Sequence, residues 1–327
     1  MAHGTIIVAT DRNWLIGDRP DPTLSGTTPW QGQLPVDMRY FKAQTKNRPV
    51  IFARPTYESI SEKHRPLIGR TNVIWTRQET YDVEGTTTVH SLDEAFDLFP
   101  NQELMICGGG HLYRVALEDP RVDIVLRTRV DGEFNGNVYF PALDEDEWRL
   151  IHSDFRQADG ENLQNCAFET YVRKSAMLVD PRNARTPEYV AELLKIQRSR
   201  KCPFCPDGKT LTAGEDEIIA QNNFWYAIRT HTPVKGAEHH WVIISKTHLT
   251  SLQEVAGAYW SEMERLLRGL QRMHEVTGGA LFVREGDTEV SGATVRHIHF
   301  NYVVPDSKAN QAACAWFGRY REPNQSP

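Results

Sequence analysis

The chain has 327 residues, of which 40% are hydrophobic and 24% are charged, and its formal net charge is −6. This length suits two domains with separate cores, and the composition is that of an ordinary soluble protein. A negative charge without a basic run argues against nucleic acid as a partner, and no apolar run is long enough for a membrane span. Five cysteines are too few for a disulfide framework here, so we expect a cytoplasmic protein.

The first half of the chain alternates short apolar strands with helical segments, which is the pattern of an α/β layer around a mainly parallel sheet. The predicted strands cover residues 6–10, 50–53, 72–76, 104–107 and 124–129. The predicted helices cover residues 37–45, 56–60, 91–99 and 112–118. Two later strands, at 152–155 and 166–173, are expected to form an antiparallel edge.

The pattern changes after residue 174, which divides the chain into a first domain at 1–174, a linker with a connecting helix at 175–200, and a second domain at 201–327. Pro187 suits the first turn of the connecting helix. In the second domain we expect strands at 224–229, 241–245, 280–284 and 297–304, and a long helix at 252–274. Residues 319–327 form a polar tail.

Asp37 is the first candidate functional residue. Pro35 favours the start of a helix, and the spacing places Asp37, Met38 and Phe41 on one helix face. An ionised carboxylate on an apolar face is costly to bury without partners, and an amidine-like ring edge that donates two parallel hydrogen bonds would supply them. The alternative is a first-turn acid that faces water and is favoured by the helix dipole.

Residues 107–113, with the sequence Cys-Gly-Gly-Gly-His-Leu-Tyr, follow a predicted strand and open a predicted helix. Glycines there let backbone amides approach a pyrophosphate, although a glycine turn without a ligand is the alternative. Arg54 and Arg77 follow two other strands, at the edge where open α/β sheets bind ligands. They could clamp the phosphate that distinguishes NADP from NAD.

Residues 5–173 resemble the dihydrofolate reductase family, because several of its motifs occur here in the family's order. The matching segments are 9–17, 29–30, 34–38, 54–60, 69–70, 107–113 and 139–141. The resemblance implies a dihydrofolate-reductase-like α/β fold, with a mainly parallel sheet flanked by helices. It also implies NADPH-dependent reduction of 7,8-dihydrofolate to 5,6,7,8-tetrahydrofolate.

The same resemblance implies roles for individual residues. Asp37, assisted by Thr128 and a water, would hold the pterin ring and promote protonation of N5, and Trp30 would contact that water. Arg70 would pair with the glutamate α-carboxylate of the substrate. The apolar substrate contacts would be Ile7, Val8, Met38, Phe41, Ile60 and Leu67. The NADPH contacts would be Ala9, Ile16, Gly17, Arg54, Thr56, Trp75, Thr76, Arg77, Cys107, Gly108, Gly109, Gly110, His111, Leu112 and Tyr113.

The chain also departs from this family in two places. Ala53-Arg54 stands where the family usually has Gly-Arg. Residues 18–28 are longer than in compact members, and this segment would be the mobile lid over the nicotinamide.

The second half carries a Cys-Pro-Phe-Cys motif at 202–205 and the alternating pattern of His297, His299 and Asn301 on a predicted strand. The cysteine pair can be a redox motif, a structural zinc site completed by two histidines, or two ordinary buried thiols. The turn that follows the pair disfavours the redox interpretation, because a thioredoxin-like motif lies between a strand and a helix.

Residues 202–306 resemble the histidine-triad family of nucleotide hydrolases and transferases, most closely at 291–301. The resemblance implies an α+β domain with an antiparallel sheet. In zinc-bearing members, two cysteines and two histidines hold the metal, and the matching residues are Cys202, Cys205, His248 and His297. His299 would attack an α-phosphate while a backbone carbonyl holds its other ring nitrogen.

Asn301 and Thr294 would bind the phosphate in that scheme. Asn301 stands where the triad has its third histidine, and residues 284–286 stand where the family has a phosphate-site asparagine. The alternative is a catalytically silent, zinc-stabilised binding or dimerisation module. A homodimer is expected by resemblance alone.

Overall fold

The computed structural model describes residues 2–18, 28–206, 218–230, 233–308, 312–313 and 315. The chain divides into two compact units, Met1–Ala176 (unit 1) and Met177–Pro327 (unit 2). Within the described ranges, we find no helix with the length and apolar character needed to cross a membrane. Most of the lid predicted at 18–28 and all of the tail at 319–327 lie outside the described residues.

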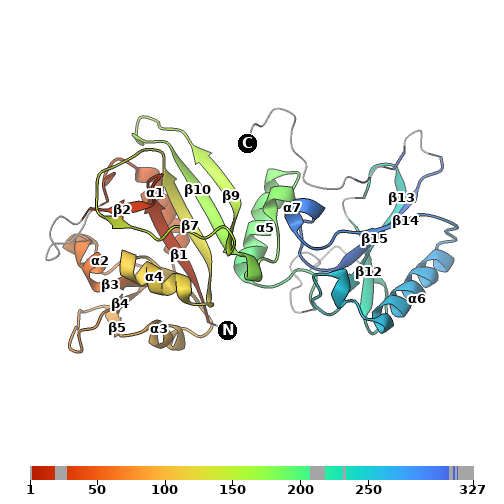
Figure 1. Ribbon diagram of the computed structural model, residues 1–327, viewed down its shortest axis with the longest axis horizontal. Coiled ribbons are helices and arrows are strands. Elements are labelled where there is room, and N and C mark those ends of the chain that lie inside the picture. Colours follow the sequence, from red (N-terminus) through yellow and green to blue (C-terminus); the bar gives the residue numbers. More distant parts are fainter. Residues whose placement is uncertain are drawn as a thin grey trace. The chain divides into compact units, whose positions relative to one another are not determined.

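Unit 1 is built on an eight-stranded sheet with four helices around it (Figure 1). Its strands are β1 (His3–Thr10), β3 (Pro49–Ala53), β4 (Thr71–Trp75), β5 (Thr86–Val89), β6 (Glu103–Ile106), β7 (Val122–Val130), β9 (Trp148–Arg156) and β10 (Cys166–Arg173). The helices are α1 (Pro35–Thr45), α2 (Arg54–Ser59), α3 (Leu92–Leu98) and α4 (Gly110–Glu118). A separate two-stranded sheet pairs β2 (Leu15–Gly17) with β8 (Val138–Tyr139).

The order of the main sheet is β5-β4-β3-β6-β1-β7-β10-β9. The pairs from β5 to β7 are parallel, and β10 and β9 add antiparallel neighbours. The mainly parallel α/β fold and its antiparallel edge are therefore confirmed. The central strands are apolar along their whole length because helices cover them, and Ile6, Ile51 and Ile106 are fully buried.

Three strands of unit 1 were missing from the sequence-based prediction. β5 contains three threonines in succession, Thr86 to Thr88, and so lacks an apolar run. β2 and β8 are only three and two residues long. Such short or polar strands depend on pairing partners far along the chain rather than on their own sequence.

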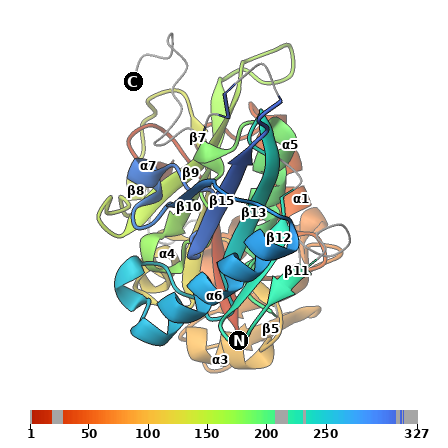
Figure 2. The ribbon, with the colours of Figure 1, turned by 90° about the vertical axis from the view of Figure 1, so that its right-hand side faces the viewer.

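Unit 2 contains a five-stranded antiparallel sheet in the order β11-β12-β13-β15-β14. Its strands are β11 (Ile218–Gln221), β12 (Trp225–Arg229), β13 (Ala237–Ser245), β14 (Ala280–Val283) and β15 (His299–Pro305). Its helices are α5 (Pro187–Ser199), α6 (Gly257–Met273) and α7 (Thr288–Ser291). The α6 helix lies across one face of the sheet (Figure 2). On that face, Leu266 and Leu270 belong to the same core cluster as Trp225 and Phe300.

The helix predicted at 252–274 is wrong at its start. Residues 252–254 form a separate 3₁₀ turn that is closed by a capping box between Ser251 and Glu254. The α6 helix begins only at Gly257. Because the capping box satisfies backbone amides at the start of this turn, the 3₁₀ turn and the α6 helix have separate N-termini.

The strand predicted at 297–304 is also shorter than expected, because β15 begins at His299. The preceding segment pairs elsewhere: Val295 forms a bridge with Val179, and the Arg296 amide donates to the Leu178 carbonyl. Leu193 and Ile196 of α5 pack on that bridge. The segment that we expected to be a linker therefore contributes to the core of unit 2.

Candidate functional sites

Asp37 lies in the first turn of α1, two residues after Pro35, which starts the helix. The residue is partly accessible, but its carboxyl group is desolvated, and this burial raises the pKa of Asp37 to about 6. A hydrogen bond from the Thr128 side chain acts in the opposite direction and lowers the pKa. Asp37 is thus not a first-turn acid that faces water, and its carboxyl group can exchange a proton close to neutral pH.

Thr128 and Trp30 lie on elements that converge on this acid. Thr128 is buried in β7, where its register partners are Ala9 in β1 and Phe168 in β10. Trp30 packs in a cluster with Phe168 and with Leu34, the residue before α1. The structure therefore brings Asp37 and Thr128 together and anchors the start of α1 on the sheet through Trp30.

The predicted apolar substrate contacts fall into two groups. Ile7 and Val8 are buried in β1, whereas Phe41, Ile60 and Leu67 are half-buried. Met38 is 64% exposed beside Asp37, and Ile68, which the sequence analysis did not select, is 91% exposed. Large apolar side chains left in water next to a desolvated acid are a feature of ligand sites.

Arg70 is fixed in place by neutral oxygen atoms. Its Nε and Nη2 atoms donate to Thr45 Oγ1 over 3.2 and 3.1 Å, and Nη1 donates to the Ile68 carbonyl over 2.9 Å. Desolvation lowers the pKa of Arg70. Its hydrogen-bond acceptors among the described residues carry no charge, so the guanidinium suits a ligand carboxylate.

The glycine turn after β6 packs closely against α2. Gly108 has a φ of +118°, which favours glycine, and a Cβ on Gly109 would lie 2.7 Å from Thr56 Oγ1. The helix α4 starts at Gly110 without a side-chain cap, so its first amides are available to an anion. Tyr113 ties the helix to the sheet, because its hydroxyl donates to the Ile7 carbonyl over 2.8 Å.

The two arginines predicted to clamp a phosphate are in different states. Arg54 forms an ion pair with Glu58 at 2.9 Å, so its charge is already compensated within α2. Arg77 is exposed, and its Nη2 donates to His111 Nε2 over 3.3 Å. The Trp75 ring lies 5.2 Å from the His111 ring. Arg77, beside His111, is therefore the more accessible of the two guanidinium groups.

The other predicted cofactor contacts lie at the ends of strands or in the core. Thr76 is buried just after β4. Cys107 is buried just after β6, and this burial raises the pKa of its thiol well above the ordinary range. Leu112 is fully buried in α4. The remaining positions are Ala9 at the end of β1, and Ile16 and Gly17 in β2.

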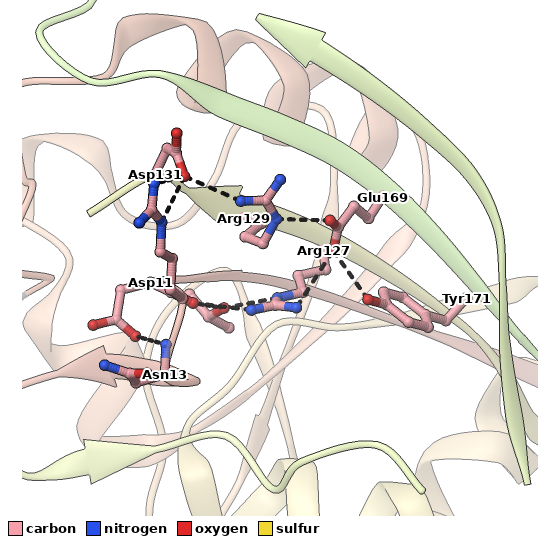
Figure 3. A network of polar contacts seen from close by, with 9 residues as sticks. Asp11, Asn13, Arg127, Arg129, Asp131, Glu169 and Tyr171 are labelled. Carbon is pink, nitrogen blue, oxygen red and sulfur yellow. Dashed lines mark hydrogen bonds and ion pairs between the residues drawn. The ribbon is translucent and has the colours of Figure 1, made fainter. Parts of the chain in front are cut away.

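Sequence reasoning missed a buried network of charges around Arg127 (Figure 3). Arg127 pairs with Glu169 at 3.4 Å, and its guanidinium lies 3.7 Å from the centre of the Trp14 ring. Arg127 Nη2 also donates to the Asp11 carbonyl over 2.9 Å. The signal was present, since Arg127 and Arg129 flank Thr128 in a strand whose other residues, apart from Asp123, are apolar. The network ties the β1–β2 turn to β7 and β10.

In unit 2, the four predicted metal ligands lie together. The ligand atoms of Cys202, Cys205, His248 and His297 are all within 4.8 Å of one another. The His297 Nε2–H donates to the Ser245 carbonyl over 2.8 Å, which leaves Nδ1 facing Cys202 Sγ at 3.3 Å. Two thiols and two imidazoles, one of them fixed by an outer carbonyl, form a donor set that suits tetrahedral zinc.

The ionisation of this cluster argues against redox chemistry. Burial raises the pKa of Cys202 to about 12, and burial lowers the pKa of His297 to about 4. A thiol with so high a pKa is a poor nucleophile in thiol–disulfide exchange. The redox interpretation of the cysteine pair therefore loses support.

His299 begins β15 next to this cluster. Its Nδ1 lies 2.7 Å from the His297 carbonyl, so Nδ1–H donates and Nε2 keeps its lone pair. Burial lowers the pKa of His299, and the nearby charge of Arg284 lowers it further. A neutral imidazole with one fixed nitrogen and one free nitrogen is the form that a nucleophile needs.

Asn301 is oriented by His240, a residue that the sequence analysis missed. The Val234 amide donates to His240 Nδ1 over 3.2 Å, so His240 Nε2 carries the proton and donates to Asn301 Oδ1 over 3.0 Å. Asn301 is 6% exposed, and within the described part of the chain its Nδ2 has no hydrogen-bond partner. A buried amide donor without a partner suits an oxyanion ligand.

Thr294, the other predicted phosphate contact, lies in the segment that pairs with residues 178–180. The Asp180 amide donates to the Thr294 carbonyl, and the Thr294 hydroxyl lies 3.2 Å from the Tyr189 hydroxyl. Its side chain thus has a structural neighbour in α5.

Comparison with known proteins divides the chain in the same way. The sequence model of the family "Dihydrofolate reductase" matches residues 4–173. Dihydrofolate reductase type 3 of Salmonella typhimurium is 38% identical over 171 residues, which cover 52% of this chain and 98% of that protein. The dihydrofolate reductase of Haemophilus influenzae is 34% identical over the same shares of the two chains. A solved dihydrofolate reductase from Enterococcus faecalis, complexed with NADP(H) and RAB-propyl, is 28% identical over 53% of this chain and 96% of that one, with a TM-score of 0.47.

A second family model, "Protein similar to CwfJ C-terminal", matches residues 192–317. It is not the histidine-triad family that we expected at 202–306, so that identification is not confirmed. The antiparallel sheet expected for the second domain is present.

Proposed function

The chain belongs to the dihydrofolate reductase family, and from this we propose that unit 1 reduces 7,8-dihydrofolate to 5,6,7,8-tetrahydrofolate with NADPH. The observation that carries the proposal is the desolvated carboxyl group of Asp37, whose pKa is raised to about 6 and whose hydrogen-bond partner in the protein is Thr128. A pterin ring edge offers two further donors to this acid.

The substrate is oriented by charges at its two ends. Asp37 binds the amidine edge of the pterin, and Arg70 binds the α-carboxylate of the glutamate, since its acceptors in the protein are neutral. The apolar contacts Met38, Phe41 and Ile60 lie along the rings and exclude water. As Asp37 exchanges a proton near neutral pH, it promotes protonation of N5 through a water held near Trp30.

NADPH, when bound, supplies the hydride that reduces the adjacent carbon of the pterin and leaves as NADP⁺. The glycine turn at 108–110 fits the backbone approach that a pyrophosphate needs, because a Cβ at Gly109 would fill the space beside Thr56. Arg77 and His111 hold the additional phosphate, while Arg54 is partly neutralised by Glu58.

The direct test is NADPH oxidation by the full chain with 7,8-dihydrofolate. We expect one tetrahydrofolate for each NADPH consumed, slower turnover with NADH, and kcat/KM that decreases with pH above about 6, where Asp37 ionises. No oxidation of NADPH with dihydrofolate, in protein whose unit 1 is folded, would contradict the proposal.

For unit 2, the geometry supports a zinc-bearing nucleotidyl hydrolase or transferase. Cys202, Cys205, His248 and His297 would hold zinc, and its binding would stabilise the fold of this unit. The His299 Nε2 lone pair attacks an α-phosphate, and the phosphorus–oxygen bond to the leaving group breaks. The Asn301 amide donates to a phosphate oxygen. The alternative remains a zinc-stabilised binding or dimerisation module without chemistry.

Two measurements separate these possibilities. Metal analysis of the purified full chain should give one zinc per chain, and a content below half of that, unrestored by added zinc, would reject the metal site. A panel of adenylyl and guanylyl substrates should then be cleaved by the wild type and not by His299→Ala. Cleavage that survives in His299→Ala would exclude this residue as the nucleophile, and no cleavage by either protein would favour the silent module.

A further inference from the structure

Phe204, the central aromatic residue of the Cys-x-x-Cys turn, contacts both of the neighbouring histidine rings. Its ring centre lies 5.9 Å from that of His297, at an interplanar angle of 85°, and 5.1 Å from that of His299, at 71°. These are edge-to-face arrangements, which orient rings as well as pack them. The motif between the two cysteines therefore reaches the proposed nucleophile.

The backbone around Phe204 is fixed from two sides. The Cys205 amide donates to the Cys202 carbonyl over 3.2 Å, which closes the turn. The Tyr226 hydroxyl donates to the Phe204 carbonyl over 2.8 Å. Tyr226 in β12 and His299 in β15 are both register partners of Ile244 in β13, the strand between them. Tyr226, which holds the turn, therefore lies in the same row of the sheet as His299.

His299 is therefore held by two groups that both belong to the cysteine–histidine cluster. The first is the carbonyl of His297, which fixes His299 Nδ1. The second is the ring of Phe204, which lies between Cys202 and Cys205 in the chain. The carbonyl belongs to one residue of the cluster, and the Phe204 backbone lies between two others, so a shift of the cluster displaces both groups.

We infer that Phe204 is a positioning residue that transmits the state of the four-residue cluster to His299. This inference rests on the zinc site and the nucleophile of the proposed function of unit 2. When the cluster is drawn together, the Phe204 ring packs against His299 and keeps the imidazole in the orientation in which Nδ1–H meets the His297 carbonyl, the bond that holds the proton on Nδ1. Metal occupancy then sets the orientation of the nucleophile as well as the stability of the domain.

The test compares the full-length wild type with Phe204→Ala, Phe204→Leu and Phe204→Tyr. Zinc content is measured in each, together with the His299 tautomer by ¹H–¹⁵N NMR of the ring nitrogens and the rate of carbethoxylation of His299. Phe224→Ala is the matched control, since Phe224 is also half-buried in unit 2 and packs on Tyr259. None of these readouts requires a substrate.

We expect Phe204→Ala and Phe204→Leu to keep zinc while the ratio of the two His299 tautomers changes roughly three- to tenfold, the range for one lost edge-to-face pair. Phe204→Tyr should restore the wild-type ratio, and Phe224→Ala should leave it unchanged. Removal of zinc from the wild type with a chelator should shift the tautomer ratio in the same direction as Phe204→Ala.

An unchanged His299 tautomer in zinc-loaded Phe204→Ala and Phe204→Leu would overturn the inference, as would an unchanged ratio after zinc removal. If Phe204→Ala loses zinc, metal-free wild type and metal-free variant are compared, and identical spectra overturn the role of the ring. If the wild type never binds zinc, the metal site is rejected. The His299 tautomer ratios of metal-free wild type and metal-free Phe204→Leu then still decide whether Phe204 holds His299. The two failures are thus distinguishable.

Discussion

Asp37 in unit 1 and His299 in unit 2 are both desolvated, yet their surroundings differ. Burial disfavours the charged form of each group. It therefore raises the pKa of the Asp37 carboxyl group to about 6 and lowers the pKa of the His299 imidazole. His299 has a backbone acceptor for its proton. The Asp37 carboxyl group accepts a hydrogen bond from Thr128 and has a large exposed apolar neighbour, Met38.

This difference shows what each site still requires. The ring nitrogen of His299 that must stay protonated is already fixed, and its cluster needs a metal ion. In the proposed function, Asp37 needs the substrate, because the pterin ring edge supplies two further donors to its carboxylate. In the proposed functions, the first site would therefore be completed by substrate binding, and the second by metal binding.

The largest effect that this comparison predicts is on hydride transfer. Asp37→Asn should lower the rate of dihydrofolate reduction at neutral pH by roughly 10²–10⁴-fold, the range for loss of a positioned acid–base group. Rapid single-turnover measurements with NADPH would show it, and binding of NADPH should remain as in the wild type. Near-normal turnover in Asp37→Asn would remove the acid from the mechanism.

Replacement of one cluster thiol tests the dependence of unit 2 on metal. Cys202→Ser should lose most of the zinc and lower the thermal stability of unit 2, because the free energy of metal binding contributes to folding. Metal analysis and calorimetry measure the two effects. Reductase turnover by the same variant is the internal control and should match the wild type. Full zinc content in Cys202→Ser would show that the sulfur is not a ligand.

Arg70 tests whether unit 1 is completed by its substrate. Arg70→Gln should raise KM for dihydrofolate roughly 10- to 100-fold, because charge-assisted hydrogen bonds contribute about 1.5–3 kcal/mol. KM for NADPH should not change. Arg39→Gln is a suitable control, since Arg39 is an exposed arginine that pairs with Glu161. Equal effects of the two substitutions would argue against a specific carboxylate site.

The smallest effect concerns stability. Since burial raises the pKa of Asp37 from its ordinary 3.8 to about 6, the folded state binds this proton more tightly than the unfolded chain, and stability falls as pH rises from about 4 to about 6. The asparagine in Asp37→Asn does not ionise, so the variant does not lose this stability as pH rises. At pH 7 it should be more stable by up to about 3 kcal/mol, at about 1.4 kcal/mol for each tenfold change in acid constant.

Denaturant titrations at several pH values would measure the difference. The advantage of Asp37→Asn should vanish below pH 4, where both side chains are neutral. A variant that is less stable than the wild type at pH 7 would mean that the carboxylate is stabilised by the fold.

Elements with a strong local signal were predictable from the sequence. Buried parallel strands such as β3 are continuous apolar runs, and Pro35 and Pro187 start α1 and α5 as expected. The four-residue cluster was also predicted, because Cys202 and Cys205 are close in sequence and the resemblance to the histidine-triad family selected His248 and His297.

The features that were missed depend on neighbours far along the chain. His240 acts on Asn301, which is 61 positions away, so its role becomes visible only when β13 and β15 pair. Likewise, Arg127 in β7 has its charge compensated by Glu169 in β10. Hydrophobic periodicity and strand propensity predict the face of the strand on which a side chain lies, but they do not identify its partner on a neighbouring strand.

The stacking of Arg127 on Trp14 gives unit 1 an intrinsic optical reporter. The guanidinium lies 3.7 Å from the centre of the indole ring, and the same arginine bonds the Asp11 carbonyl at the start of the turn that leads into β2. An indole under a fixed positive charge emits at a wavelength that depends on that distance. Fluorescence difference spectra between wild type and Trp14→Phe should therefore follow any ligand that shifts this turn, without a label attached to the protein.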